Sequence, residues 1–485
     1  MNNLEIEFYE PSKINKKIKR TKIITTIGPS THSKEDMRKL YEAGMNVVRL
    51  NFSHGSQVEH EEKIKSCMEL REELEKPISI MLDTKGPEIR IGKMIDGAQE
   101  IKAGTEVRIY SNESEYKTKE CKLTEMTVSY DMSVDLKPGD TVLVDDGKLT
   151  LNVINVDPGI IFCKAFNSHV VKTNKRVNLP GVDFSLPFLS QKDIEDIKFG
   201  AKIGVDYIAA SFVNSADNVN EIRKILKDAK NENVQIISKI ESKIGIFNID
   251  SIIEASDGIM VARGDLGLEI PYYEVPYWEK QMIRKCRKAG KIVVVATQML
   301  ESMTDNPQPT RAEVTDVYYA TELGTDATML SGESAVGIYP FITTETMATI
   351  NKRAELGFYG KIYYDRALEI AKSSSSGKRA EIADELANIT RNGKYEFAVV
   401  LSRTGELLKT ISKFRPNVTI LGVCEDESLW TKFGVWHSIF MNKVKSIDEI
   451  IANPELASEI ARSWGAKKGE EILIVRSEDI KVYTV

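Results

Sequence analysis

The sequence predicts an α/β protein built on a (β/α)8 barrel, with a small β-barrel lid domain inserted into the barrel and a C-terminal α/β domain after it. Eight short apolar runs alternate with amphipathic stretches, as an eight-stranded parallel barrel requires. One long interruption contains short Val-, Ile- and Thr-rich pieces between turn motifs, and a second α/β alternation follows the eighth run. At 485 residues, the chain is also too long for one ordinary core.

The eight apolar runs are predicted to be parallel barrel strands. They lie at residues 22–26, 47–51, 78–83, 207–211, 235–239, 258–262, 292–297 and 327–330. Amphipathic segments such as 34–43, 59–74, 216–230 and 276–288 lie between them and are long enough to be crossover helices. Buried parallel strands are apolar inside, so polar side chains fall at their carboxyl ends, where the barrel binds ligands.

The interruption predicts a separate β domain. The turn motifs KPGD (137–140), DDGK (145–148) and DPG (157–159) separate its short strands and are typical of hairpins. An insertion at the barrel mouth is positioned to act as a lid. After residue 358, strands are expected near 398–402, 419–423, 438–441, 471–475 and 481–485. We therefore expect barrel segments at 1–85 and 186–357, the lid at 86–185 and the C-terminal domain at 358–485.

Composition excludes several classes of protein. No apolar run approaches the ~20 residues that cross a bilayer, and the N-terminus lacks the apolar core of a signal peptide, so we expect a cytoplasmic protein without a membrane partner. A net charge of −6 gives no reason to bind nucleic acid. The five cysteines have no zinc or disulfide spacing. The basic run 13–22 is predicted to be a solvated helix face.

Two stretches join an apolar strand to charged residues, IISKIE (236–241) and GIMVARGDLGLE (258–269). Lys239 and Glu241 are two residues apart and face the same side if the strand continues through them, while Asp265 follows the next strand. An ammonium, two carboxylates and a metal ion could then share one mouth. Two alternatives stay open: Lys239 could extend to solvent from the strand end, and Asp265 could cap a short helix at 266–268.

Seven stretches resemble the motifs of the pyruvate kinase family, in the family's order. They are NVVRLNFSHG (46–55), MLDTKGPEIR (81–90), IISKIES (236–242), MVARGDLGLEIP (260–271), VATQMLESM (295–303), PTRAEVTDV (309–317) and MLSGESA (329–335). The resemblance implies phosphoryl transfer from phosphoenolpyruvate to ADP, giving ATP and pyruvate, the last step of glycolysis. It also implies a homotetramer that uses Mg²⁺, for which Mn²⁺ can substitute, and K⁺.

The resemblance assigns a role to each candidate residue. Lys239 contacts the phosphoryl group and stabilises the enolate, and Thr297 orients the proton source through water. Arg49 binds phosphate, and the turn at Gly264 and Asp265 receives the substrate carboxylate. The remaining sets are Glu241 with Asp265 for magnesium, Asn51, Ser53, Asp83 and Thr84 for potassium, and Asn51, His54, Arg90 and Lys175 for the nucleotide. Glu88 matches potassium-dependent members.

The loop at 402–407 (SRTGEL) departs from the hydroxyl-rich phosphate loop of sugar-phosphate-activated members. We therefore do not expect activation by fructose 1,6-bisphosphate, although Arg403 and Thr404 leave room for another phosphorylated effector. Two other functions are considered, a metal-dependent lyase or aldolase acting on oxo acids and a catalytically silent scaffold. ADP-dependent formation of pyruvate distinguishes the first, and absence of magnesium binding would favour the second.

Overall fold

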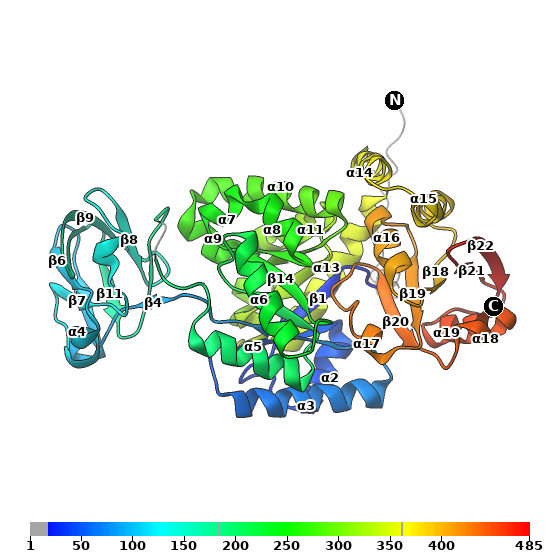
Figure 1. The fold of residues 1–485 in the computed structure, drawn as a ribbon, viewed down its shortest axis with the longest axis horizontal. Helices are drawn as coiled ribbons and strands as arrows, with labels where there is room; N and C mark the ends of the chain where they lie inside the picture. Colours follow the sequence, from blue (N-terminus) through cyan, green and yellow to red (C-terminus); the bar gives the residue numbers. More distant parts are fainter. Residues whose placement is uncertain (1–17, 183–184, 360–361) are drawn as a thin grey trace.

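The computed structural model describes residues 18–182, 185–359 and 362–485. The molecule is elongated, with three parts side by side along its longest axis (Figure 1). The eight-stranded barrel lies in the middle, the lid lies on one side of it, and the C-terminal sheet with its helices lies on the other.

Eight parallel strands close the barrel in the order β1-β17-β16-β15-β14-β13-β3-β2. They are β1 Lys22–Thr26, β2 Val47–Asn51, β3 Ser79–Asp83, β13 Tyr207–Ala210, β14 Gln235–Ile240, β15 Gly258–Ala262, β16 Ile292–Ala296 and β17 Ala327–Leu330. Each predicted strand is confirmed to within one residue at either end. Their residues are almost all buried, because helices cover the outside of the barrel and side chains fill its interior.

Helices cover the outside of the barrel. They are α2 Lys34–Ala43, α3 Gln57–Leu74, α5 Gln191–Ile203, α6 Ala216–Asp228, α7 Lys243–Phe247, α8 Ile249–Ala255, α9 Arg263–Glu269, α10 Val275–Ala289, α11 Arg311–Glu322, α12 Gly332–Ala335 and α13 Pro340–Phe358, with short 3-10 turns at Tyr272–Glu274 and Glu301–Thr304. Capping boxes begin several of them. Ser33, Ser56, Ser190 and Ser215 each accept a hydrogen bond from the third residue of the helix that follows, which fixes where the helix starts.

The insertion is a β domain, as predicted. Its seven-stranded sheet has the order β4-β12-β8-β9-β10-β6-β7. The strands are β4 Ile89–Arg90, β6 Glu106–Tyr110, β7 Glu125–Thr127, β8 Thr141–Val144, β9 Leu149–Asp157, β10 Ile160–Ala165 and β12 Arg176–Asn178; β5 Ala98–Ile101 pairs separately with β11 His169–Lys172, and α4 Glu113–Thr118 and 3-10 turns at Ile95–Gly97 and Met132–Val134 complete the domain.

The lid sheet closes on itself through the ends of its two edge strands. Gly92 N donates to Thr127 O at 2.8 Å, and Ser129 N donates to Arg90 O at 3.0 Å, which confirms the small β-barrel. The DDGK and DPG motifs join antiparallel strand pairs, β8 to β9 and β9 to β10. In the first of these turns Asp145, Asp146 and Gly147 all have positive φ, a conformation that Asp and Gly tolerate.

The C-terminal part holds a five-stranded sheet in the order β20-β19-β18-β21-β22. Its elements are α14 Ile362–Ser373, α15 Lys378–Thr390, β18 Phe397–Leu401, α16 Glu406–Phe414, β19 Thr419–Cys424, α17 Glu427–Trp430, β20 Ile439–Lys443, α18 Ile447–Ala452, α19 Glu455–Ser463, β21 Glu471–Val475 and β22 Ile480–Thr484. The division into segments 1–85, 86–185, 186–357 and 358–485 remains our proposal, which these separate sheets support.

The C-terminal part covers the amino ends of the barrel strands. Ser79 Oγ donates to Thr431 O at 2.5 Å, and the Tyr207 hydroxyl donates to Lys432 O at 2.5 Å. Ser79 and Tyr207 each begin a barrel strand, so the opposite, carboxyl ends are left for the side from which the lid emerges.

The prediction of a solvated helix at the N-terminal basic run is wrong for the residues that can be assessed. Residues 13–17 lie outside the described residues, but Lys19, Arg20 and Lys22 are buried and Lys22 belongs to β1. Lys22 Nζ donates to Ile439 O at 2.6 Å. Packing against the C-terminal part therefore buries these basic side chains, which the sequence predicts to be solvated. The five cysteines are free, as their spacing predicts, and all five are buried. Among the described helices, none is long and apolar enough to cross a membrane.

Candidate active site

Lys239, on β14, is the centre of a polar cluster at the carboxyl ends of the barrel strands. Its Nζ lies 3.1 Å from Asp83 Oδ1, 3.1 Å from Glu241 Oε1 and 2.8 Å from Ser211 Oγ. Burial alone would lower the pKa of this ammonium, but the carboxylates of Asp83 and Glu241 outweigh burial and raise its pKa above the usual value. Lys239 is therefore a fully charged cation in a buried position, not a side chain extending to solvent.

Asp83 links this cation to a second one. Arg49 Nε donates to Asp83 Oδ2 at 2.7 Å, and Arg49 Nη1 donates to Thr26 Oγ1 at 2.6 Å. Burial opposes ionisation of Asp83, but Arg49 and Lys239 together hold the pKa of its carboxyl below the usual value. The mouth thus presents two fixed positive charges on either side of one carboxylate.

Asp265 lies near enough to Glu241 to affect the charge of the Glu241 carboxyl. Glu241 lies just after β14, and its Oε2 accepts a hydrogen bond from Phe212 N at 2.7 Å. Burial raises the pKa of the Glu241 carboxyl, Lys239 opposes this rise, and Asp265 adds to it. Asp265 accepts a hydrogen bond from the Arg176 guanidinium, which comes from β12 of the lid.

Asp265 does not cap a helix at 266–268. Helix α9 begins at Arg263, so Asp265 lies in its first turn, and Ala262 occupies the N-cap position without a side-chain hydrogen bond. A carboxylate in the first turn is still favourable, because it faces the positive end of the helix dipole. Within the described residues, no three His, Cys, Asp or Glu side chains form a metal cluster. A metal ion at Glu241 and Asp265 would need water or substrate oxygens as further ligands.

Thr297 and Gly264 form a strained junction beside this pair. Gly264 N donates to Thr297 Oγ1 at 2.7 Å, and Thr297 Oγ1 donates to Ala296 O at 2.6 Å. Thr297 has φ of 67°, and Gln298 has φ of 53°, both in the left-handed region that costs energy for these residues. A Cβ at position 264 would stand 3.3 Å from Thr297 Oγ1, so glycine permits this close contact.

The four residues predicted for potassium lie at two adjacent strand ends. The β2–β3 register pairs Asn51 with Asp83. Asn51 Oδ1 accepts a hydrogen bond from Ser53 N at 3.1 Å, and Thr84 O accepts one from Ser211 Oγ at 2.7 Å. The structure therefore gathers oxygen atoms of the predicted set, with some of them engaged in protein hydrogen bonds.

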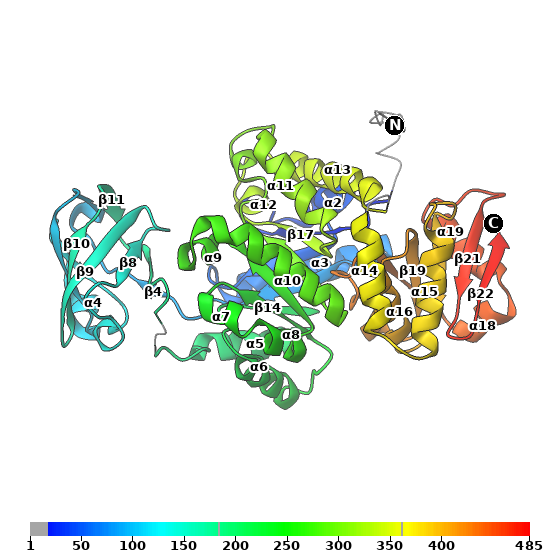
Figure 2. The ribbon, with the colours of Figure 1, turned by 90° about the horizontal axis from the view of Figure 1, so that it is seen from above.

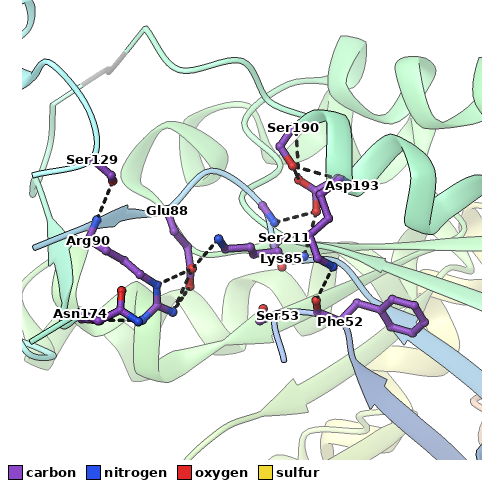
Figure 3. A network of polar contacts seen from close by, with 12 residues as sticks. Phe52, Ser53, Lys85, Glu88, Arg90, Ser129, Asn174, Ser190, Asp193 and Ser211 are labelled. Carbon is purple, nitrogen blue, oxygen red and sulfur yellow. Dashed lines mark hydrogen bonds and ion pairs between the residues drawn. The ribbon is translucent and has the colours of Figure 1, made fainter. Parts of the chain in front are cut away.

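Of the predicted nucleotide residues, Asn51 pairs in register with Asp83 of the Lys239 cluster, whereas Arg90 and Lys175 pair with other residues. Arg90 Nη2 lies 3.0 Å from Glu88 Oε2, and Arg90 Nη1 donates to Asn174 O at 2.9 Å (Figure 3). Lys175 Nζ lies 2.7 Å from Asp145 Oδ1, within the lid. The backbone carbonyl of His54 accepts a hydrogen bond from the His60 ring at 2.8 Å. In this lid position Arg90 and Lys175 are held by residues of the lid and its connection to the barrel.

Three residues of the cluster escaped the sequence analysis. Ser211 is the polar last residue of the predicted strand 207–211, so the rule that selected Lys239 also selects it. Phe212 acts through its backbone amide, with φ of 54°, and its residue type gives no sign of this. Arg176 contacts Asp265 across 89 positions of sequence, which no local pattern predicts.

Comparison with known proteins extends over most of the chain. The family model described as pyruvate kinase, barrel domain, matches residues 18–344. The pyruvate kinase of Sporosarcina psychrophila is 43% identical over 464 residues, covering 94% of this chain and 77% of the relative. That of Mycoplasma pneumoniae is 40% identical, covering 91% and 93%, and that of Clostridium acetobutylicum is 41% identical, covering 90% and 91%.

Proposed function

The chain belongs to the pyruvate kinase family, and from that premise we propose how its own residues carry out the family's reaction. It is a phosphotransferase that moves the phosphoryl group of phosphoenolpyruvate to ADP, giving ATP and pyruvate, in the last step of glycolysis. What remains to be assigned is the role of each side chain at the barrel mouth.

The charged, buried ammonium of Lys239 is the observation that carries the assignment. Phosphoryl transfer spreads negative charge over the oxygens of the moving group, so positioned positive charge is the protein's main contribution. Three contacts fix Lys239 Nζ, and two of them are carboxylates that keep it protonated. We assign Lys239 to the transferring phosphoryl group and to the enolate oxygen that forms when the phosphorus–oxygen bond breaks.

Arg49 and the Gly264–Asp265 turn are proposed to orient phosphoenolpyruvate. Asp83 and Thr26 hold the Arg49 guanidinium in a fixed orientation. Its planar set of N–H donors is well suited to bind phosphate oxygens. The backbone amides at the start of α9 would bind the substrate carboxylate, for which Gly264 N must give up its hydrogen bond to Thr297 Oγ1. Thr297 is assigned to the methylene carbon that takes up a proton, where its hydroxyl orients a water molecule, because threonine is too weak an acid to supply the proton alone.

The family needs a divalent metal ion and potassium, and the donor set at the mouth fits both. We assign Mg²⁺, or Mn²⁺ in its place, to Glu241 and Asp265, whose oxygens are hard ligands of the kind these ions prefer. The raised pKa of Glu241 supports this, because burial and the nearby Asp265 raise it despite the Lys239 ammonium, so a further positive charge would stabilise the ionised carboxylate. When bound, the ion neutralises charge on the phosphate and enolate oxygens. Potassium is assigned to Asn51, Ser53, Asp83 and Thr84.

The nucleotide is proposed to bind Asn51, His54, Arg90 and Lys175. Because Arg90 and Lys175 are paired within the lid and its connection in this structure, binding ADP requires them to exchange Glu88 and Asp145 for phosphate oxygens. Movement of the lid toward the mouth would accompany that exchange.

We also propose a homotetramer that acts in the cytoplasm, where glycolysis takes place. Val336 and Ile338 lie just before α13 and are 58% and 65% exposed, and Ile342 in its first turn is 47% exposed. Such a cluster of exposed large apolar side chains is typical of a protein contact surface. Light scattering of the purified protein tests the assembled state.

One coupled assay tests the reaction. Pyruvate formed from phosphoenolpyruvate is measured by its reduction with NADH, with and without ADP, magnesium and potassium. The proposal expects turnover only when ADP and a divalent ion are both present. Pyruvate formed without ADP would favour a lyase or aldolase, and no turnover under any condition would favour a silent scaffold.

A further inference from the structure

A cationic cavity lies at the end of the barrel opposite to the active site. Its volume is about 300 Å³, and residues of α10, α14 and α16 line most of it. Helix α14 contacts both α10 and α16 (Figure 2). Helix α10 ends just before β16 begins, so this end of the helix is on the amino-end side of the barrel. The Lys239 cluster is at the carboxyl ends of the strands.

Basic side chains dominate the lining of this cavity. Those that line it are Lys280, Arg284, Arg287, Lys288, Arg366 and Lys413, against one acid, Glu322. Within the part of the chain that the structure describes, the side chains of Arg284, Arg287, Lys288 and Arg366 have no hydrogen bond or ion pair to protein groups. Two acids on the neighbouring helices are already paired, Asp365 with Arg391 and Asp384 with Lys372.

Arg287 is the least compensated of these cations. Burial, with a smaller contribution from the nearby Arg415, lowers the pKa of its guanidinium to about 10. Asp326 is the acid that would balance it, but Asp326 Oδ1 pairs with Arg415 Nη2 at 2.8 Å. Arg287 Nε is buried without a hydrogen-bond partner among the described residues, and the guanidinium carbon lies 5.4 Å from the centre of the Phe358 ring. Arg287 is half-buried, and a cation that is partly removed from water without its own counter-charge is costly; a bound anion would lower that cost.

The backbone around the cavity makes room for these side chains. Gly324 has φ of 88°, and a Cβ there would stand 2.9 Å from Arg287 Nη1. Gly290 has φ of 68°, and a Cβ there would stand 3.2 Å from Lys413 Cδ. Any larger residue at position 324 would displace Arg287, and any larger residue at position 290 would displace Lys413. The two glycines therefore leave room for these cations.

The helix dipole explains part of the charge but not all of it. Basic residues in the last turn of a helix are favourable, and this accounts for Arg287 and Lys288 in α10. Arg284 lies one turn earlier, Arg366 comes from α14, and Lys413 comes from α16, where its Nζ donates to Ser374 O at 2.7 Å. Cations from three helices that face one cavity require a different explanation.

We propose that this cavity binds a small compound carrying two or more phosphate groups. Guanidinium and ammonium groups are the side chains that bind phosphate best, and Arg284, Arg287 and Lys288 offer them from one helix. A volume of about 300 Å³ is at the lower end of small-molecule sites, which suits a compact polyphosphate. Leu323 and Ile370 line the rest of the wall and would contact the carbon part of such a compound.

Calorimetry with inorganic tripolyphosphate tests this site. The titrations use the intact protein in the presence of EDTA, with sodium sulfate at equal ionic strength as the non-specific comparison. The cavity is altered by Arg284→Glu with Lys288→Glu, two exposed positions four residues apart, and separately by Arg287→Gln. Lys198→Glu with Lys202→Glu on α5 is the matched control, because this pair is also exposed, has the same spacing and does not line the cavity.

The proposal expects tripolyphosphate binding that weakens at least tenfold in the Arg284/Lys288 variant and in Arg287→Gln, and that stays unchanged in the Lys198/Lys202 variant. The Arg284/Lys288 variant should retain its pyruvate kinase activity within twofold, which shows that it is folded and separates this site from the mouth. The proposal is overturned if wild-type protein binds tripolyphosphate no better than sulfate, if the Arg284/Lys288 variant binds as wild type does, or if both double variants lose equal affinity. If Arg287→Gln does not fold, the two double variants still decide the question.

Discussion

Replacing Lys239 with methionine removes the charge of the ammonium and keeps most of the side chain's volume. The three contacts of Nζ, to Asp83, Glu241 and Ser211, are lost. Charged groups that act on a phosphoryl transition state are worth 10³-fold or more in rate, so we expect turnover to fall by at least about 10³-fold, equivalent to about 4 kcal/mol in the barrier.

The same change alters stability in a pH-dependent way. Asp83 keeps Arg49 as its partner, whereas Glu241 keeps only the Phe212 amide. Breaking a buried ion pair costs about 3–5 kcal/mol when the remaining group stays charged without a partner. Glu241 avoids this cost by taking up a proton. Burial already raises its pKa, and the loss of Lys239 raises that pKa further. The stability that protonated Glu241 contributes is present at low pH and is lost as pH rises through its folded-state pKa. The Lys239→Met variant should therefore be least stable in alkaline solution.

The assay is the coupled formation of pyruvate at pH 6 and pH 8, with urea unfolding at both pH values. Lys291→Met is the matched control, since Lys291 Nζ donates to Ser256 O at 2.6 Å on the other side of the barrel. The control should retain full turnover. A Lys239→Met protein that works within tenfold of wild type, a difference of ~1.4 kcal/mol, would show that the ammonium does not act on the phosphoryl group.

Three further predictions follow from neighbouring contacts. Arg176→Gln removes the guanidinium that competes for Asp265, so Mn²⁺ should bind the substrate-free protein several-fold more tightly by calorimetry; unchanged or weaker binding contradicts the competition. Burial raises the pKa of Glu279 to about 7, so the stability that its protonated carboxyl contributes is present below about pH 4.5 and is lost as pH rises through about 7. Relative to Glu279→Gln, the free energy of unfolding of wild type in urea should fall by about 3 kcal/mol over that range. Parallel pH profiles of the two proteins would refute this. Replacing potassium by sodium should lower the rate of pyruvate formation at least tenfold, and full activity in sodium would remove the monovalent site from the assignment.

The barrel could be predicted because its physics is local. Each strand is a short apolar run, and the requirement that polar side chains fall at the carboxyl ends selects Arg49, Asp83 and Lys239 without any knowledge of their neighbours. The two-residue spacing of Lys239 and Glu241 was sufficient to place their side chains together, at 3.1 Å in the structure. The turn motifs DDGK and DPG located two hairpins of the lid for the same reason.

What the sequence could not provide depends on contacts between distant segments. Lys22 is buried where it donates a hydrogen bond to Ile439, more than 400 residues along the chain, whereas the lysine-rich pattern by itself predicts a solvated face. The sequence predicts too late a start for α9 because Gly264 favours a turn, whereas the helix of the structure includes Gly264. The partnership of Arg176 with Asp265 depends on where the lid lies relative to the barrel.

The central claim is that Glu241 and Asp265 hold a divalent ion beside the Lys239 ammonium. Electron paramagnetic resonance of Mn²⁺ measures this directly, by counting the ions bound to wild type and to Glu241→Gln, Asp265→Asn and Lys239→Met. Asp250→Asn is the control, because Asp250 is an exposed acid that pairs with Lys285 on the surface. We predict one ion per chain in wild type, the control and Lys239→Met, and at least tenfold weaker binding in the two carboxylate variants. Wild-type affinity in both carboxylate variants would contradict the assignment.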